Sequence, residues 1–465
     1  MERPADVHQP HPLTQVPYDP AVTDTTGSHD DALDLLAFIA ASPSPYHAVA
    51  EAGRRLHAAG FVELHETDSW PLAPGRHFLV RGGSLVAWSG DAGAAAGGDG
   101  FRVIGAHTDS PNLRVKPRPD TGRAGWRQLG VEIYGGVLLN SWLDRDLGLS
   151  GRVTVLDGAT PASSPVTHLF RDDRALLRIS QLAIHLDREI NQTGLKLNPQ
   201  QHLVPTWGLG SAAPGDFVRY LAGQLDVDPD AVLAWDVMAH DVVPGGLAGI
   251  DDELVSAARL DNQLSCWAAL QALLDTGDLA TGDQEPGPVS VVVLFDHEEI
   301  GSTSASGADS DLLPTTLERI VHTGGGDRDA FHRAVAVSRC VSADGAHATH
   351  PNYAERHEPD HLIALDGGPV LKHNANVRYA TDAVTAGRFE AACRAVDVPV
   401  QHFVSRDDMP CGSTIGPITA GRLGIPTVDV GVAQLAMHSI RELCGSSDPT
   451  HFRRALGAFL GAVVE

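Results

Sequence analysis

The chain has 465 residues, more than one ordinary hydrophobic core holds, so we expect two domains or one domain with a large insertion. Hydrophobic residues make up 43% and charged residues 20%, as is typical of soluble globular proteins. The formal net charge of −25 disfavours nucleic acid and anionic membranes as partners, because both bind basic surfaces.

The cysteine pattern and the N-terminus both favour the cytoplasm. The five cysteines are scattered and contain no C-x-x-C pair, which indicates a reducing compartment without a disulfide framework or a structural zinc knuckle. The first twenty residues are polar and lack the apolar core of a signal peptide. No segment reaches about 18 unbroken apolar residues, so we expect no membrane span.

The first hundred residues predict an arm, two helices and short strands. Residues 1–28 are rich in Pro, Asp and Thr without periodicity, which predicts a loose arm. The stretch DALDLLAFIAASPSPYHAVAEAGRRLHAAG predicts two helices separated at a proline pair, the first capped by Asp30 or Asp31. FLVRGGSLVAWSG and FRVIGAH predict strands, and the linker GDAGAAAGGDG between them predicts a hairpin loop.

The pattern of predicted elements changes between residues 116 and 249. Short strands (VEIYGGVLLNSW, GRVTVLDG) precede the run RALLRISQLAIHLDREIN, which predicts a helix, and a section rich in Pro and Gly follows. From residue 250 apolar strands alternate with helices again, a pattern typical of an α/β sandwich. We therefore predict one α/β domain in two sequence halves, 29–115 and 250–465, interrupted by a middle domain at 116–249.

Five apolar segments of the predicted α/β domain end in carboxylates or imidazoles. Ligands of α/β proteins gather outside the carboxyl ends of the strands, so these side chains are expected to meet. Taken singly, each has a plainer interpretation: a helix cap for Asp261, a hydrogen-bonded structural residue for a histidine. Their recurrence favours a metal site. The five polar ends are His107 with Asp109, Asp261, the run Asp296–Glu299, Asp344 with His347, and His438.

Imidazole and carboxylate ligands without cysteine suit zinc, manganese or cobalt. Five ligands are more than one catalytic zinc uses, so two ions bridged by a carboxylate account for the number better. Of the adjacent Glu298 and Glu299, one is expected to bind metal and the other to act as general base. Neighbouring residues of a strand point apart, so the chain must leave the strand there, as Gly301 permits. Asp109, two residues after His107, is placed to orient its imidazole.

With these residues in view, the chain resembles the M18 family of metallopeptidases, the aspartyl aminopeptidases. The resemblance covers about residues 100–445 in the order of the family. It implies a three-layer α/β sandwich of the zinc-peptidase type, with a central mixed sheet interrupted by a mostly β dimerisation or lid domain. The matching stretches are GAHTDSPNLRVKP, LAIHLDREIN, SAARLDNQ, LFDHEEIGS, SADGAHATHPNY, GPVLKHNANVRYAT, DDMPCGSTIGP and AMHSIRE.

The resemblance implies a role for each of these residues. Glu298 corresponds to the general base, Asp109 to the acid that orients the imidazole of His107, and Asp261 to the bridging ligand. His185 corresponds to a histidine that reaches a neighbouring subunit's site, or alternatively binds metal. The family also implies a homo-oligomer, a tetrahedral dodecamer. The implied metal ligands are His107, Asp261, Glu299, Asp344 and His438, and the implied substrate-binding residues are His347, Lys372 and Tyr379.

The predicted reaction is hydrolysis of the first peptide bond of a peptide by a metal-bound hydroxide, with two divalent ions, zinc or else cobalt or manganese. A preference for N-terminal Asp or Glu needs a cation, for which Lys372 is the candidate and Arg378 a possible helper. The alternatives are a broad-specificity aminopeptidase, a deacylase or a carboxypeptidase on the same fold. A non-catalytic, metal-stabilised assembly protein is a further alternative, against which Glu298 argues, because a structural metal site needs no free base.

Overall fold

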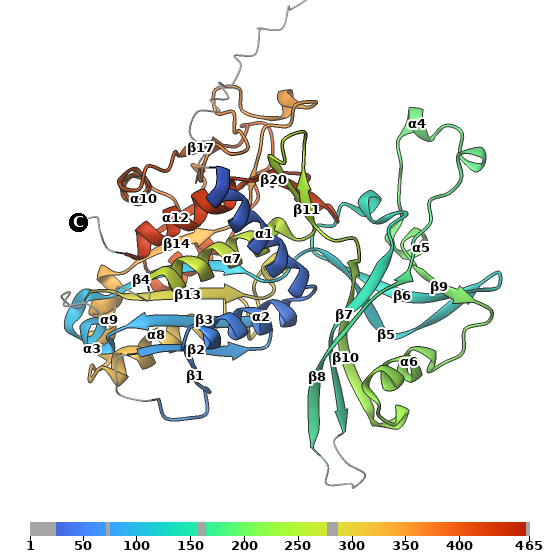
Figure 1. Ribbon diagram of the computed structural model, residues 1–465, viewed down its shortest axis with the longest axis horizontal. Helices are drawn as coiled ribbons and strands as arrows, with labels where there is room; N and C mark the ends of the chain where they lie inside the picture. The colour runs from blue at the N-terminus through green and yellow to red at the C-terminus, as the bar shows by residue number, and fades with distance from the viewer. Residues whose placement is uncertain (1–24, 71–74, 157–163, 277–286, 462–465) are drawn as a thin grey trace, which may run out of the picture.

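A computed structural model of the chain describes residues 25–70, 75–156, 164–276 and 287–461. In these residues the strands form three sheets, of nine, six and five strands. The nine-stranded sheet lies between two layers of helices, and the six-stranded sheet projects from it to one side (Figure 1). The predicted three-layer α/β sandwich with a central mixed sheet is confirmed.

The central sheet is mixed, with parallel strands at the position that matters for the site. β13 and β14 pair with the two sides of β4, both in parallel. The carboxyl ends of these three neighbours therefore open at one edge of the sheet. The order is β1 (Val62–Glu63), β2 (Gly75–Arg81), β3 (Ser84–Gly90), β13 (Val289–Phe295), β4 (Phe101–His107), β14 (Arg339–Ala343), β18 (Thr427–Gly431), β16 (Val370–His373) and β17 (Gln401–Val404).

Both faces of the central sheet are buried, which explains why its strands are continuous apolar runs. On β13, Val292 and Leu294 join one hydrophobic core, and Val291 and Val293 join the other. The first core lies under α1 (Thr25–Ala41), α2 (Pro45–Ala58), α7 (Leu260–Asp275), α10 (Ala383–Ala395) and α12 (Asp448–Leu460). The second lies under α3 (Ala92–Ala94), η2 (Ala95–Asp99), α8 (Leu312–Thr323), α9 (Arg328–Val337) and α11 (Ile415–Leu423).

The middle of the chain forms the antiparallel six-stranded sheet. A core of its own, which includes Phe170, Phe217 and Leu221, fills one face of this sheet. This segment is mostly β, as predicted, while the domain boundaries and the lid or dimerisation role stay predictions. The order is β8 (Pro165–Leu177), β7 (Leu147–Leu156), β10 (Val232–Asp241), β5 (Asn112–Arg123), β6 (Trp126–Tyr134) and β9 (Thr206–Leu209), with α6 (Asp216–Leu225) packed against it.

A small third sheet joins distant parts of the chain. Its β12 pairs antiparallel with β20, and β20 pairs with β19. This pairing brings the start of α7 next to the segment after residue 435. The order is β11 (Gly246–Ala248), β12 (Leu254–Ala257), β20 (Glu442–Gly445), β19 (Ala433–Leu435) and β15 (Ala346–His347).

Three local predictions are wrong. The first helix begins at Thr25 rather than at a cap at Asp30 or Asp31, and Asp31 instead contacts Thr450 and Arg453 of α12. The linker 90–100 is no hairpin loop, because β13 lies between β3 and β4. Its alanines form short helical turns that bury Ala94 and Ala95.

The run 174–191 is not one helix. Its first residues continue β8, where Leu177 is buried and pairs with Leu147 of β7. Only the short turns η4 (Ile184–Leu186) and α4 (Ile190–Thr193) are helical. Strand pairing and burial of Leu177 outweigh the helical propensity of this run.

Residues 1–24 of the predicted arm lie outside the described residues. Within the residues that the structure describes, no helix is both long enough and apolar enough to span a membrane.

Candidate metal centre and active site

Three adjacent strands of the central sheet deliver one half of the site. His107 is the last residue of β4. Glu298 and Glu299 follow β13, and Asp344 directly follows β14. Because these parallel strands are neighbours, their ends bring the four side chains to one edge of the sheet.

The other half comes from the small third sheet. Asp261 lies in the first turn of α7, shortly after β12, and His438 lies between β19 and β20. His438 has a positive φ of 66°, which turns the chain sharply into the site. The antiparallel pairing of β12 with β20 brings these two residues together.

The carboxylate of Asp261 lies between two groups of ligands. Its Oδ1 is 3.4 Å from His107 Nε2, which is itself 3.3 Å from Asp344 Oδ1. Its Oδ2 is 3.6 Å from His438 Nε2, which is 3.4 Å from Glu299 Oε2. Each oxygen of one carboxylate thus faces a different pair made of one imidazole and one carboxylate.

These distances fit divalent metal ions. Two ligand atoms on one tetrahedral ion, with bonds of about 2.0–2.2 Å, lie about 3.3–3.6 Å apart. Ligand atoms of His107, Asp261 and Glu299 all lie within 4.8 Å of one another. Asp261 Oδ1 and Glu299 Oε1 are buried and have no hydrogen-bond partner among the described residues. Buried carboxylate oxygens need such a partner, and a cation would supply it.

Both imidazoles present Nε2 to the site because their other nitrogen is already bound. His107 Nδ1 lies 3.0 Å from the main-chain oxygen of Asp109, and His438 Nδ1 lies 2.9 Å from that of Gly136. A Cβ at residue 136 would come within 2.9 Å of His438 Nδ1, so glycine allows this close approach. Donation from Nδ1–H to a carbonyl leaves Nε2 free to bind metal.

Burial and neighbouring charges shift the pKa values of the site residues in opposite directions. Burial lowers the pKa of His438, but Asp261 and Glu299 raise it overall to about 10. Burial raises the pKa of Asp261, but the two imidazoles outweigh burial and leave it lowered. Burial and the carboxylate of Asp261 hold the pKa of Glu299 well above its usual range. Divalent ions would relieve this crowding of buried acids.

Glu298 and Glu299 point to different places because the chain leaves the strand before them. His297 has a positive φ of 68°, and the 3₁₀ turn η7 (Glu298–Ile300) follows. Glu299 faces His438, whereas Glu298 lines the pocket without an ion pair to the ligand residues. The sharp exit was expected at Gly301 but begins at His297. Burial raises the pKa of Glu298 to about 7, which suits a general base.

Asp109 supports the site mainly through the main chain of its neighbours. Its carboxylate accepts hydrogen bonds from the backbone N–H groups of Glu298 and Glu299, both at 3.1 Å, and from Tyr134 Oη at 2.7 Å. Its Oδ1 is 3.5 Å from His107 Nδ1, farther than the main-chain oxygen of the same residue. Asp109 therefore fixes the turn that carries both glutamates.

A pocket of about 480 Å³ opens beside these residues. Lys372 lines it and is only 2% exposed, with Nζ 3.6 Å from Asp344 Oδ2 and over the ring of Tyr379. His347 and Tyr379 line the same pocket, as does Phe403, which the sequence did not indicate. The predicted substrate-binding residues His347, Lys372 and Tyr379 thus lie together beside the predicted ligands.

His185 is the one predicted site residue that the structure places elsewhere. It lies in η4, on an exposed arm (residues 182–195) of the middle segment, and does not line the pocket. In Figure 1 the neighbouring turn α4 projects well away from the central sheet. Leu182, Ile184 and Leu186 of this arm are 60%, 48% and 73% exposed.

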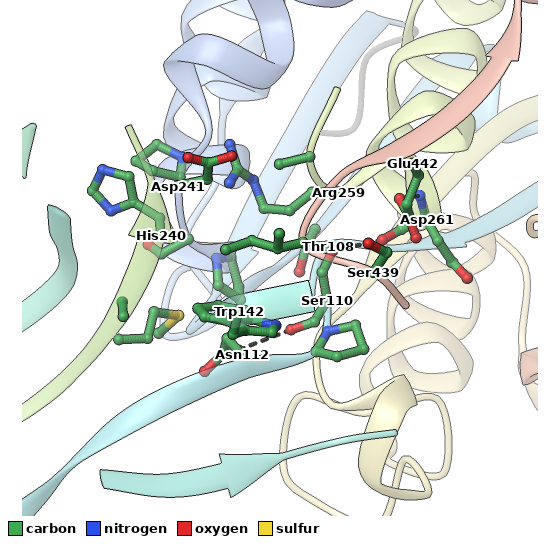
Figure 2. Close-up of a pocket in the computed structure, with 18 residues that line it drawn as sticks. Thr108, Ser110, Asn112, Trp142, His240, Asp241, Arg259, Asp261, Ser439 and Glu442 are labelled. Atoms are coloured by element: carbon green, nitrogen blue, oxygen red, sulfur yellow. Dashed lines mark hydrogen bonds between the residues drawn. The ribbon is translucent and has the colours of Figure 1, made fainter. Parts of the chain in front are cut away.

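Besides Phe403, two residues that contact the site also escaped sequence reasoning. Tyr134 comes from β6 of the middle sheet, and nothing in its local sequence indicates that it reaches Asp109. Glu442 stands in the stretch AMHSIRE, four residues after His438, so it was within a recognised motif but had no assigned role. Figure 2 shows Glu442 beside Asp261, at the edge of a second, small pocket of about 30 Å³.

Comparisons with known proteins identify the family of the chain. The family model described as "Aminopeptidase I zinc metalloprotease (M18)" matches residues 38–460. "Probable M18 family aminopeptidase 2" of Streptomyces coelicolor is 53% identical over 428 residues, covering 92% of this chain and 96% of that protein. The protein of the same name from Mycobacterium leprae is 53% identical over 431 residues, covering 93% and 98%.

Solved structures of M18 relatives also match the chain. The chain matches "Cryo-EM structure of the Ape4 and Nbr1 complex" with a TM-score of 0.89 and 38% identity, covering 94% of this chain and 86% of that one. It matches "Structure of S. cerevesiae mApe1 dodecamer" with a TM-score of 0.81 and 28% identity, covering 94% and 97%. The chain belongs to the M18 family and is a metallo-aminopeptidase.

Proposed function

We propose that the protein is a binuclear zinc aminopeptidase that preferentially removes N-terminal Asp or Glu from peptides. The observation that carries the binuclear part is the position of Asp261, with one oxygen toward His107 and Asp344 and the other toward His438 and Glu299. A single ion would not use both sides of this carboxylate. Cobalt and manganese have similar ligand preferences and are expected to replace zinc.

Different residues of the protein have different roles in the proposed reaction. Ions held by the five ligands would supply Lewis-acid polarisation of the scissile carbonyl and a lowered pKa of water. Glu298, ionised near neutral pH, accepts a proton from the attacking water and returns it to the leaving amine. Asp109 holds the turn on which Glu298 lies, and so sets the position of its carboxylate.

Lys372 is the proposed partner of an acidic substrate side chain. Its ammonium group is almost fully buried and lies at the wall of the catalytic pocket. Asp344 partly neutralises it at 3.6 Å in the absence of metal. When Asp344 binds a cation, the ammonium regains attraction for a substrate carboxylate. Arg378 is exposed, with Nε toward the main-chain oxygen of Gly412, and is a weaker candidate.

We also propose that the chain forms a homo-oligomer, a tetrahedral dodecamer in which His185 reaches a neighbouring copy. One solved relative is named a dodecamer, and the exposed leucines and isoleucine around His185 suit burial at an interface. Light scattering should give a mass near that of twelve chains. Leu186→Asp should shift the protein to smaller species, and a monomeric wild type would contradict the assembly.

The central experiment measures release of Asp, Glu and Leu from otherwise identical peptides. It is run before chelation, after chelation, and after return of zinc or cobalt. Release of Asp and Glu that is lost with chelator and restored by metal is the expected result. Release of Leu alone would retain the metal site and reject the role of Lys372, favouring a broad-specificity enzyme. No release with metal bound would favour another target bond or a non-catalytic protein.

A further inference from the structure

We infer that Glu442 is a positioning residue that holds Asp261 and His438 in the geometry that binds metal. The inference rests on the proposed metal site and assigns a role to a residue outside the five ligands and the base. Glu442 is the first residue of β20 and is 2% exposed. It lies beside Asp261 in Figure 2.

Each oxygen of the Glu442 carboxylate accepts one main-chain hydrogen bond. The backbone N–H of Asp261 donates to Oε2 at 3.0 Å, and that of His438 donates to Oε1 at 2.7 Å. These two donors belong to separate segments, the start of α7 and the loop between β19 and β20. One buried side chain therefore ties together the main chain of the bridging residue and of a terminal ligand.

Fixing these two amides sets how the two ligand side chains leave the backbone. The 3.6 Å separation of Asp261 Oδ2 from His438 Nε2 depends on where the Cα atoms of both residues lie. Among the described contacts, Glu442 is the side chain that accepts hydrogen bonds from both of these backbone amides. Asp109 does the same for Glu298 and Glu299. Two buried carboxylates thus position four of the residues around the site, without using a ligand atom.

A carboxylate suits this task better than an amide does. Both of its oxygens accept, whereas glutamine offers one acceptor and one NH₂ group, which cannot accept from a backbone N–H. Removal of groups that orient metal ligands typically lowers metal affinity by about 10–100-fold.

A purely structural role must be distinguished from this one, because β20 pairs with β12 in the third sheet. Asp448 provides the matched control. It is 1% exposed, and its Oδ2 accepts hydrogen bonds from the backbone N–H groups of Asp366 at 3.0 Å and Gly445 at 3.1 Å. It is thus a buried acid that joins two segments, but neither segment carries a predicted ligand.

The test compares wild type, Glu442→Gln and Asp448→Ala after metal removal and Co²⁺ titration. The dissociation constant is measured by competition with a chromophoric chelator, and the visible absorption of bound Co²⁺ reports its coordination. For Glu442→Gln we expect a dissociation constant about 10–100-fold higher, an altered Co²⁺ spectrum, and a lowered kcat at saturating metal with KM little changed. Asp448→Ala removes both hydrogen bonds to Asp366 and Gly445, so it should lower the melting temperature and leave the dissociation constant and spectrum as in wild type.

Wild-type affinity and spectrum in Glu442→Gln would overturn the inference, even if its melting temperature falls. Equal losses of affinity in both variants would overturn it too, because the effect would then be general destabilisation. If Glu442→Gln does not fold, as judged by circular dichroism, Glu442→Asp replaces it. This variant keeps the charge but is one methylene too short to reach both amides, and the same loss of affinity is expected. A wild type that binds no Co²⁺ would instead refute the proposed metal site itself.

Discussion

Glu298→Gln tests whether Glu298 is the general base while the adjacent Glu299 is a metal ligand. The substitution keeps the shape of the side chain and removes its ability to take a proton. Glu298 lines the pocket and makes no ion pair with the five ligand residues, so its loss should not release metal. The matched control is Glu299→Gln, because Glu299 Oε2 lies 3.4 Å from His438 Nε2 and should be a ligand.

The magnitude follows from the environment of Glu298. Burial raises its pKa to about 7, and a base whose pKa lies near the working pH contributes about 10²–10⁴-fold to the rate. The corresponding barrier change is roughly 3–5.5 kcal/mol, since each tenfold step is about 1.4 kcal/mol. The base must be deprotonated, so kcat/KM of wild type should rise with pH through the pKa of Glu298. Bound dications would lower this pKa, placing the rise at or below about 7.

The assay combines kcat/KM on an N-terminal Asp peptide from pH 5 to 9 with metal analysis of the same samples. Glu298→Gln should retain wild-type metal content, lose activity by the stated factor and lose the acid-side rise in its pH profile. Glu299→Gln should lose metal affinity. The reasoning would be refuted by a Glu298→Gln enzyme that keeps near-wild-type kcat/KM, or that loses metal as readily as Glu299→Gln does.

Three further predictions concern specificity, stability and the middle sheet. Lys372→Met should reduce the preference for Asp over Leu peptides by about 10–100-fold, because it removes one hydrogen bond between charged groups. Its metal content should stay unchanged. An unaltered ratio of Asp to Leu release would show that Lys372 does not determine specificity. The metal-free protein should lose stability, on the order of 5 kcal/mol, as pH rises from about 5 to 8. Glu298 and Glu442 have pKa values raised to about 7 and about 8, so the folded state binds more protons than the unfolded state and stability falls until they ionise. Thermal melts with and without Zn²⁺ should show the metal restoring more stability at pH 8 than at pH 6, and the reverse order would contradict this account. Phe217→Ala, in the fully buried core of the middle sheet, should cost about 3–5 kcal/mol and produce a separate early transition in calorimetry; a single shifted transition would argue against an independent 116–249 domain.

Much of the candidate site could be predicted because its residues follow apolar strands directly. His107 and Asp344 stand at the ends of β4 and β14, where the sequence changes abruptly from apolar to polar. A strand buried on both faces leaves few positions for charge, so its end is informative. The local errors arose where pairing decided the outcome: the run 174–191 contains residues that suit a helix, yet its first part extends β8.

Other contacts of the site could not be predicted, because they join segments far apart in the chain. Tyr134 reaches Asp109 from the middle sheet, and Gly136 accepts from the imidazole of His438. His185 shows the opposite case, since a residue in a matching motif lies on an exposed arm outside the pocket of its own chain.

The sequence by itself determined the chemistry: imidazole and carboxylate ligands, a spare glutamate, a lysine, and apolar strands to carry them. These are properties of residue type and local periodicity, which neighbouring positions in the chain are enough to reveal. Only the tertiary structure decided which oxygen of Asp261 faces which imidazole, that Glu298 and Glu299 diverge at His297, and that Glu442 bridges two ligand backbones. Those features depend on sheet order and on contacts between residues that are as much as 181 positions apart in the sequence. Such contacts cannot be predicted from local sequence patterns.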